Sequence, residues 1–462
     1  MRPIEMPKTS GSMKWSPVAW RIPATRLAIS TATTPPIRPP TIDCPVKMSN
    51  GDAQCCRTRC GYSSQTATLL PTIAPSRQPR ASVKPEPRHS ERGEAWVQYQ
   101  PLGVVGIVSP WNFPVNLAFG GLAGALAAGN RVMIKPSEFT PKTSQLMARM
   151  VRSVYAEDEV AVILGGPEVG QAFCAQPFDH LLFTGATSVG KHVMRAAAEN
   201  LVPVTLELGG KSPTILSRSA DFKAAVSKII TGKMHNAGQI CLSPDYVFVP
   251  EESLADFVAA AKAVLAGYFP TLLANPDYTS VINARHFQRL NAYLDEAREA
   301  GVELVELNPA NEDFSGQAHH KIAPTLLINP GDELAVMQDE IFGPLLPVKS
   351  YTSIEEVVRY INAHPRPLGL YYFGTDPVEE AFVLNRTVSG GVTLNDVIRH
   401  VGVESLPFGG VGPSGMGAYH GLDGFRTFSH ARAVFRPTDG PDLMRPPFVE
   451  QVKQIVASLI QR

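Results

Sequence analysis

A regular alternation of short apolar runs and helix-length segments is the feature that most limits the folds open to this chain. Residues 102–108 are an apolar run that predicts a buried strand, residues 131–135 predict the next strand, and residues 117–128 predict a helix between them. Parallel strands need a crossover of about this length, usually a helix. We therefore predict an α/β fold with parallel sheets that helices cover on both faces.

The alternation continues and then repeats, which predicts two Rossmann-like units. Further strands are expected at residues 160–164, 180–184, 204–208, 213–216, 246–249, 325–328, 368–373 and 391–394, and further helices at 140–155, 190–199, 222–235, 252–266, 284–300 and 449–460. We assign residues 94–206 to a cofactor-binding domain and 207–394 to a catalytic domain. Residues 94–100, with the segment 395–462, are expected to form a small bridging sheet and a C-terminal tail.

The N-terminal stretch, residues 1–93, differs in composition from the rest of the chain. It contains 14 of the 41 prolines and 14 Lys and Arg against 5 Asp and Glu, with no apolar periodicity. A segment of this kind buries too little apolar surface to order itself. We expect an atypical segment, which is either a disordered or targeting extension or the product of a shifted reading frame.

The charge balance excludes one class of partner. The whole chain has 42 Lys and Arg and 42 Asp and Glu, so it lacks the basic surplus that binds nucleic acid. No apolar run reaches the roughly 18 residues of a membrane span. We predict neither a nucleic-acid partner nor a membrane span.

Cysteine usage indicates a reducing compartment. Four cysteines fall in the N-terminal stretch, namely Cys44, Cys55, Cys56 and Cys60. Their spacing lacks the paired ligands of a zinc site, so we predict no metal site. Only Cys174 and Cys241 occur in the remaining chain, which is not a disulfide framework, and a cytoplasmic location is expected.

One of these two thiols follows a glycine-containing turn at the end of a predicted helix. Residues 236–241 read Asn-Ala-Gly-Gln-Ile-Cys, so Cys241 lies in a loop. A thiol reacts as the thiolate and needs donors or positive charge nearby. The alternative is a buried, inert residue, which we expect for Cys174.

Four segments in order now carry a family resemblance: residues 183–190, 206–211, 236–241 and 340–344. They resemble the signature segments of the NAD(P)-dependent aldehyde dehydrogenase superfamily. Residues 235–246 and 419–430 most resemble the coniferyl aldehyde dehydrogenases and their class 3, fatty-aldehyde-type relatives. The resemblance covers about residues 94–435.

The resemblance implies a nucleophile, an oxyanion donor and a base. Cys241 would add to an aldehyde carbonyl, and the amide of Asn112, on a loop stiffened by two prolines, would stabilise the oxyanion. Glu207, at the end of a strand, would activate the water that cleaves the resulting thioester. The residues alone also allow Asn112 to be a turn former and Glu207 a surface carboxylate.

The implied cofactor is NAD, with NADP as the alternative. Gly185 and Gly190, with Ser188 between them, form a strand-to-helix turn that admits a pyrophosphate. Lys135 and Glu138 follow a strand and resemble the adenosine-ribose contacts. A carboxylate there should repel a 2′-phosphate. A solvated charge pair is the other interpretation of these two residues.

The nicotinamide half is assigned by resemblance to a later segment. Glu340 resembles the residue that holds the nicotinamide ribose, and Phe342 the ring that packs beside it. An acidic pair, Asp339 and Glu340, ahead of an apolar run could equally form a plain turn.

These residues predict the oxidation of an aromatic or other bulky apolar aldehyde to its acid. A dehydrogenase that passes the acyl group to coenzyme A stays open, although Glu207 argues against it. A nucleotide-binding protein without turnover also stays open, although the joint presence of Asn112, Cys241 and Glu340 argues against that. The expected partners are a small-molecule aldehyde and a second copy of the chain in a homodimer.

Overall fold

The computed structural model describes residues 85–90, 93–438, 446 and 448–461. The four cysteines of the N-terminal stretch, and the prediction of disorder, targeting or a shifted frame for residues 1–84, lie outside this part of the chain. Residues 85–90 lie inside it, and Glu86–Arg88 form a strand, β1. Three residues of the segment that was expected to be atypical thus form a strand.

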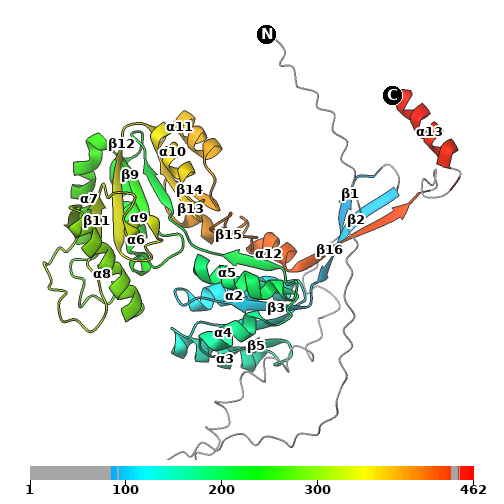
Figure 1. The fold of residues 1–462 in the computed structure, drawn as a ribbon, viewed down its shortest axis with the longest axis horizontal. Helices are drawn as coiled ribbons and strands as arrows, with labels where there is room; N and C mark the ends of the chain where they lie inside the picture. The colour runs from blue at the N-terminus through cyan, green and yellow to red at the C-terminus, as the bar shows by residue number, and fades with distance from the viewer. Residues whose placement is uncertain (1–84, 91–92, 439–445, 447, 462) are drawn as a thin grey trace, which may run out of the picture. The chain divides into compact units, whose positions relative to one another are not determined.

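The first sheet has six strands in the order β15-β7-β6-β3-β4-β5, and five of them are parallel (Figure 1). The parallel strands are β3 (Val104–Val108), β4 (Arg131–Lys135), β5 (Val160–Val162), β6 (His180–Thr184) and β7 (Val204–Glu207). Their predicted positions are confirmed to within two residues at each end.

Helices cover both faces of this sheet, as predicted. Alternate residues of β3 enter different clusters: Val105 packs with α2 (Pro114–Ala127) and α3 (Pro141–Val154), and Val104 packs with α4 (Pro167–Cys174) and α5 (Thr187–Ala198). The period of two along a strand sends successive side chains to opposite faces.

The second sheet has seven strands in the order β10-β11-β12-β9-β8-β13-β14. Its strands are β8 (Pro213–Leu216), β9 (Tyr246–Pro250), β10 (Glu303–Glu306), β11 (Thr325–Ile328), β12 (Leu345–Tyr351), β13 (Gly369–Phe373) and β14 (Gly391–Leu394). The pairs are parallel except β10 with β11, which is antiparallel. The predicted parallel-type sheet is confirmed, with this one antiparallel pair at its edge, and β10 and β12 were not predicted.

Helices also cover both faces of the second sheet. One core cluster includes α6 (Phe222–Met234) and α7 (Leu254–Tyr268), and the other includes α8 (Ala284–Glu299), α10 (Ile354–Ala363) and α11 (Pro377–Arg386). The described part of this region also contains the short helix α9 (Ala335–Gln338) and the 3₁₀ turns η2 (His235–Gly238), η3 (Glu251–Ser253) and η4 (Arg399–Gly402).

A third, antiparallel sheet joins the two ends of the described chain. Strand β2 (Gly93–Pro101) pairs with β1 and along its whole length with β16 (Ser429–Pro437), which follows α12 (Gly421–Thr427). The glycine-rich segment before α12 contributes β15 (Gly415–Met416), which pairs with β7 of the first sheet. Helix α13 (Phe448–Ile460) is the last element.

Candidate active site

The candidate site lies at the carboxyl edge of the first sheet. Because β3, β4, β6 and β7 are parallel, the residues that follow them meet at one edge. The chain order reverses between β3 and β6, and α/β sheets bind ligands at such a switch point. Seven of the ten predicted site residues end or follow these strands: Asn112, Lys135, Glu138, Gly185, Ser188, Gly190 and Glu207. Cys241 comes from the loop after η2, which Asn112 contacts at Gln239.

The turn after β6 suits the pyrophosphate of a dinucleotide. Helix α5 begins here, and neither a side-chain cap nor an acidic residue in its first turn occupies its free N–H groups. Ser188 is exposed in that first turn. Gly190 is buried, and a Cβ there would overlap Leu208, so a glycine lets the helix approach the sheet.

Lys135 and Glu138 lie together at the end of β4. The Lys135 ammonium is 3.8 Å from the Glu138 carboxylate and donates to the carbonyl of Pro136 at 2.8 Å. Lys135 is buried, and burial lowers the pKa of its ammonium. Lys135 is therefore held in place by the fold, whereas Glu138 is exposed.

The amide of Asn112 lies beside the loop that carries the thiol. Its Nδ2 donates to the carbonyl of Gln239, two residues before Cys241, at 3.1 Å. An amide nitrogen carries two hydrogens, so this bond leaves one for another acceptor. Asn112 is consequently fixed against the Cys241 loop and is more than a local turn former.

The Cys241 loop has an unusual backbone that other segments hold in place. Asn236 and Ala237 adopt left-handed φ angles of 50° and 51°. The buried Gln239 side chain accepts from the N–H of Ile282 and donates to the carbonyl of Ser280, both at 3.0 Å. The left-handed turn and its anchors hold the half-buried Cys241 in one position. Sequence reasoning did not assign Gln239 a role, although it lies inside the cysteine segment.

The thiol itself is protonated in this environment. Burial raises the pKa of Cys241 to about 12, and the charges of Glu340 and Glu207 add to the effect. Both carboxyl groups are therefore within electrostatic reach of the sulfur. Cys174, by contrast, is buried in the core, as predicted, and burial raises the pKa of its thiol to about 11.

Glu207 is a buried acid without a partner. It is the last residue of β7 and only 2 % exposed, and neither carboxyl oxygen has a hydrogen bond. Burial raises the pKa of Glu207 well above its ordinary range. Buried polar groups are almost always satisfied, so such an exception indicates a functional role. Glu207 is not the surface carboxylate of the alternative interpretation.

Glu340 and Phe342 enter from the second sheet, just before β12. The carboxylate of Glu340 lies against Gly209, where a Cβ would overlap it, and its Oε1 has no hydrogen-bond partner. Burial and the charge of Asp245 raise the pKa of Glu340 to about 8. Phe342 has a left-handed φ of 50° and packs edge-on against Trp111 at 5.4 Å.

The residues present thus fit a bound dinucleotide. Glu340 supplies a hydrogen-bond acceptor, because its Oε1 has no partner. The uncapped start of α5 supplies an anion site, and the buried Lys135 supplies a cation. Within the described ranges, no group of three His, Cys, Asp or Glu side chains could hold a metal ion. No described helix is long and apolar enough to cross a bilayer.

Comparisons with known proteins identify the family of the chain. The sequence profile of the aldehyde dehydrogenase family matches residues 65–434, which extends the similarity upstream of the predicted start at residue 94. A probable coniferyl aldehyde dehydrogenase of Caulobacter vibrioides is 60% identical over 373 residues, 80% of this chain and 77% of that protein. The coniferyl aldehyde dehydrogenase of Pseudomonas sp. strain HR199 is 54% identical over 413 residues, 87% of this chain and 86% of that one.

Solved structures show the same fold. Staphylococcus aureus AldH, in its substrate-bound state, superimposes with a TM-score of 0.76 at 35% sequence identity, over 88% of each chain.

Proposed function

Because the chain belongs to the aldehyde dehydrogenase family, we propose that it oxidises an aromatic or other bulky apolar aldehyde, with Cys241 as nucleophile and Glu207 as base. The enzyme is NAD(P)-dependent. The observation that carries the proposed roles is the partnerless, buried carboxyl of Glu207 within electrostatic reach of the thiol.

In the first half-reaction, the sulfur of Cys241 bonds to the aldehyde carbon, the thiol proton passes to solvent water, and the electron pair of the carbonyl double bond moves to the oxygen. The negative charge that forms on the carbonyl oxygen is stabilised by the free N–H of Asn112, which the bond to Gln239 orients. NAD(P)+, when bound, would supply the acceptor for the hydride that leaves the former aldehyde carbon. A thioester on Cys241 remains.

In the second half-reaction, Glu207 removes a proton from water, whose oxygen attacks the thioester carbon. The carbon–sulfur bond breaks, the acid leaves, and the thiol is restored. A base works best when its pKa lies near the working pH, and burial moves Glu207 in that direction. The same residue supports hydrolysis over transfer to coenzyme A.

Cofactor contacts are proposed for both halves of the dinucleotide. Lys135 and Glu138 would hold the adenosine ribose, and the α5 turn with Gly185, Ser188 and Gly190 the pyrophosphate. Glu340 would accept from the nicotinamide ribose, with Phe342 packed beside the ring. The negative charge of Glu138 supports NAD over NADP, because it repels a 2′-phosphate.

The substrate class rests on the surroundings of the thiol and on the relatives. Cys241 and Phe113 pack on a core cluster that contains Phe408 and Tyr419. Aromatic rings of this kind favour a flat, apolar substrate. Coniferyl aldehyde is the substrate that we propose, since the named relatives act on it.

Steady-state kinetics over an aldehyde series, with NAD+ and with NADP+, tests this function. We expect kcat/KM to be highest for coniferyl aldehyde with NAD+, to fall with short aliphatic aldehydes, and not to respond to coenzyme A. Cys241→Ala should abolish turnover while NAD+ binding persists. NADH formation by that variant at more than a few per cent of the wild-type rate would contradict the nucleophile, and a lack of wild-type turnover would contradict the function.

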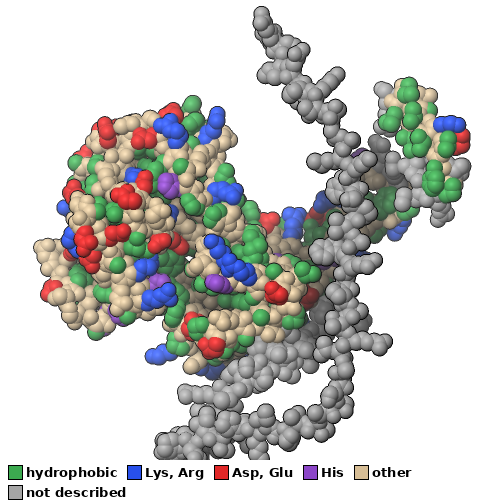
Figure 2. Space-filling view, viewed as in Figure 1, with side chains coloured by type: hydrophobic (Ala, Val, Ile, Leu, Met, Phe, Trp, Pro, Cys, Tyr) green, Lys and Arg blue, Asp and Glu red, His purple; other side chains and the backbone are tan. Residues whose placement is uncertain are grey.

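A homodimer and a cytoplasmic location complete the proposal. Phe435 of β16 is 53 % exposed, and the apolar side chains of α13 are also exposed, as Figure 2 shows. Monomers rarely leave such surfaces open, so they support a contact between copies. The reduced cysteines of the described chain, Cys174 and Cys241, support a reducing compartment.

A further inference from the structure

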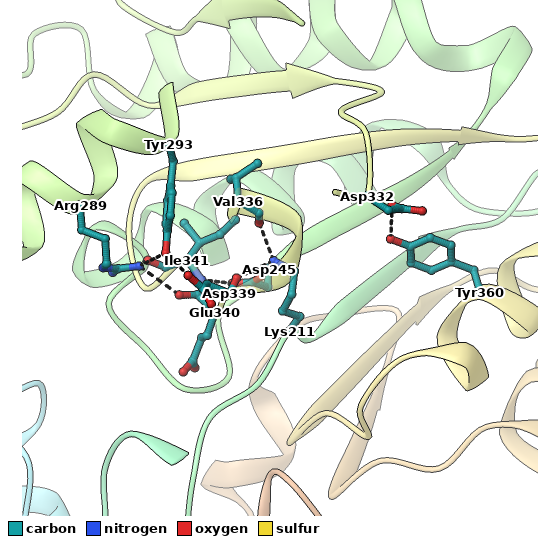
Figure 3. Close-up of polar contacts among 10 residues, drawn as sticks. All are labelled: Lys211, Asp245, Arg289, Tyr293, Asp332, Val336, Asp339, Glu340, Ile341 and Tyr360. Carbon is teal, nitrogen blue, oxygen red and sulfur yellow. Dashed lines mark hydrogen bonds and ion pairs between the residues drawn. The ribbon is translucent and has the colours of Figure 1, made fainter. Parts of the chain in front are cut away.

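A buried aspartate links the segment of the nucleophile to the segment of Glu340. Asp245 is four residues after Cys241, 2 % exposed, and its Oδ1 accepts from the backbone N–H of Ile341 at 3.0 Å. Its Oδ2 accepts from the ammonium of Lys211 at 2.5 Å. One carboxylate therefore joins three chain segments that are far apart in the sequence (Figure 3).

The lysine of this pair reaches the same segment from another side. Lys211 also donates to the carbonyls of Val336 at 2.7 Å and Asp339 at 2.9 Å. Since Lys211 lies in the loop that directly follows Glu207, these bonds hold the Glu340 segment next to the strand end that carries the base. Charge-assisted bonds of this kind are stronger than those between neutral groups.

Two residues of helix α8 also hold the segment of residues 339–341. Arg289 donates to the carbonyl of Glu340 at 3.2 Å and to that of Ile341 at 2.7 Å. Tyr293 donates to the carboxylate of Asp339 at 2.9 Å. The main chain of residues 339–341 is thus held on both sides of Glu340, while the Glu340 side chain points away from these contacts (Figure 3).

We propose that Asp245, supported by Tyr293, is a positioning residue that sets where Glu340 presents its carboxylate to the nicotinamide ribose. The inference rests on the proposed function, because that function assigns Glu340 to the ribose. Sequence spacing alone gives no hint of it, since Asp245 and Ile341 are separated by 96 residues.

The pH dependence distinguishes positioning from a general structural role. The charge of Asp245 is one of the causes that raise the pKa of Glu340, so its removal should lower that pKa. The groups that face Glu340 are Asp245, Lys211, Arg289, Lys233 and Cys241. A ribose hydroxyl donates best to an ionised carboxylate, so NAD+ affinity should rise as Glu340 ionises.

Isothermal titration of the unliganded enzyme with NAD+ and with ADP tests the proposal. Asp245→Asn should weaken NAD+ binding about tenfold, equivalent to about 1.4 kcal/mol, and move the midpoint of its pH dependence to lower pH. Binding of ADP, which lacks the nicotinamide ribose, should be unchanged. Tyr293→Phe should weaken NAD+ binding about threefold, less than a full charge-assisted bond is worth.

Two matched control variants make the same Asp→Asn and Tyr→Phe changes at another hydrogen-bonded acid and tyrosine pair. Asp332 accepts from Lys349 at 2.8 Å and from Tyr360 at 2.6 Å, apart from the Glu340 segment. Asp332→Asn and Tyr360→Phe should leave both affinities unchanged.

The outcomes separate the two proposals. Wild-type NAD+ affinity and pH midpoint in Asp245→Asn would overturn the positioning role, and so would equal losses for NAD+ and ADP. If Asp245→Asn fails to fold, wild-type affinity in Tyr293→Phe overturns it. Absent NAD+ binding or aldehyde turnover in the wild-type enzyme would instead overturn the proposed function.

Discussion

The acid that is proposed as base also destabilises the folded chain. Burial raises the pKa of Glu207, so the folded state keeps a proton that the unfolded state loses above the ordinary value of 4.5. The folded state then binds more protons than the unfolded state, and stability falls as pH rises. Between pH 4.5 and the raised pKa of Glu207, each pH unit lowers the free energy of unfolding by about 1.4 kcal/mol at most.

We therefore expect Glu207→Gln to raise the melting temperature, and to raise it more at pH 8 than at pH 5. Gln cannot ionise, so the variant lacks the pH-dependent loss. Differential scanning calorimetry across this range measures the effect. A variant whose gain does not grow with pH would show that Glu207 is not held protonated by burial.

Most proposed site residues could be found from the sequence, but not the reasons that they work. Asn112, Glu207 and Cys241 were predicted by motif resemblance. The absence of partners around Glu207, and the role of Asp245, depend on tertiary packing that brings together residues far apart in the chain. No local pattern encodes such contacts.

At the scale of elements, the turn η2 decides where the thiol is presented. Gly238 has a φ of +73°, and a Cβ there would overlap the carbonyl of Gly343, next to the Glu340 segment. The turn and that segment therefore pack backbone against backbone, which only a glycine permits.

Gly238→Ala should lose most activity and several kcal/mol of stability. The left-handed φ alone costs a non-glycine residue about 1–2 kcal/mol, and the overlap of the new Cβ with the carbonyl of Gly343 adds to that cost. Gly301 has a similar φ of +76° with nothing within 4 Å of a Cβ. Gly301→Ala should show the smaller stability loss and keep wild-type turnover. Equal activity in both variants would contradict the packing argument, and kinetics with urea unfolding would reveal it.

The elements that were predicted are those with a local signal. Strands β3, β4 and β6 are continuous apolar runs, as buried parallel strands are. Strand β1 has the sequence Glu-Pro-Arg, which carries no such pattern, and its pairing with β2 comes from tertiary contact: Glu86 bonds to Tyr99 at 3.0 Å and pairs with Arg426 at 2.8 Å. Strand β12 has the sequence Leu-Leu-Pro-Val-Lys-Ser-Tyr, in which Pro347 and Lys349 interrupt the apolar pattern, and it was not predicted.

For the whole molecule, the proposed dimer is open to a direct test. Phe435→Asp places a charge on the exposed face of β16 and should shift the chain from twice the monomer mass to the monomer mass in light scattering. Val154→Asp, at a 72 % exposed residue of α3, is the control and should leave the mass unchanged. A wild-type monomer, or a Phe435→Asp dimer, would contradict this contact.

Rapid mixing of Glu207→Gln with NAD+ and coniferyl aldehyde tests whether Cys241 forms a thioester that Glu207 hydrolyses. We expect an NADH burst of about one per site, because hydride transfer precedes the step that needs the base. Mass spectrometry of the quenched protein should find the acyl group on the peptide that contains Cys241. A full burst with the acyl group elsewhere, or steady turnover at the wild-type rate, would contradict the account.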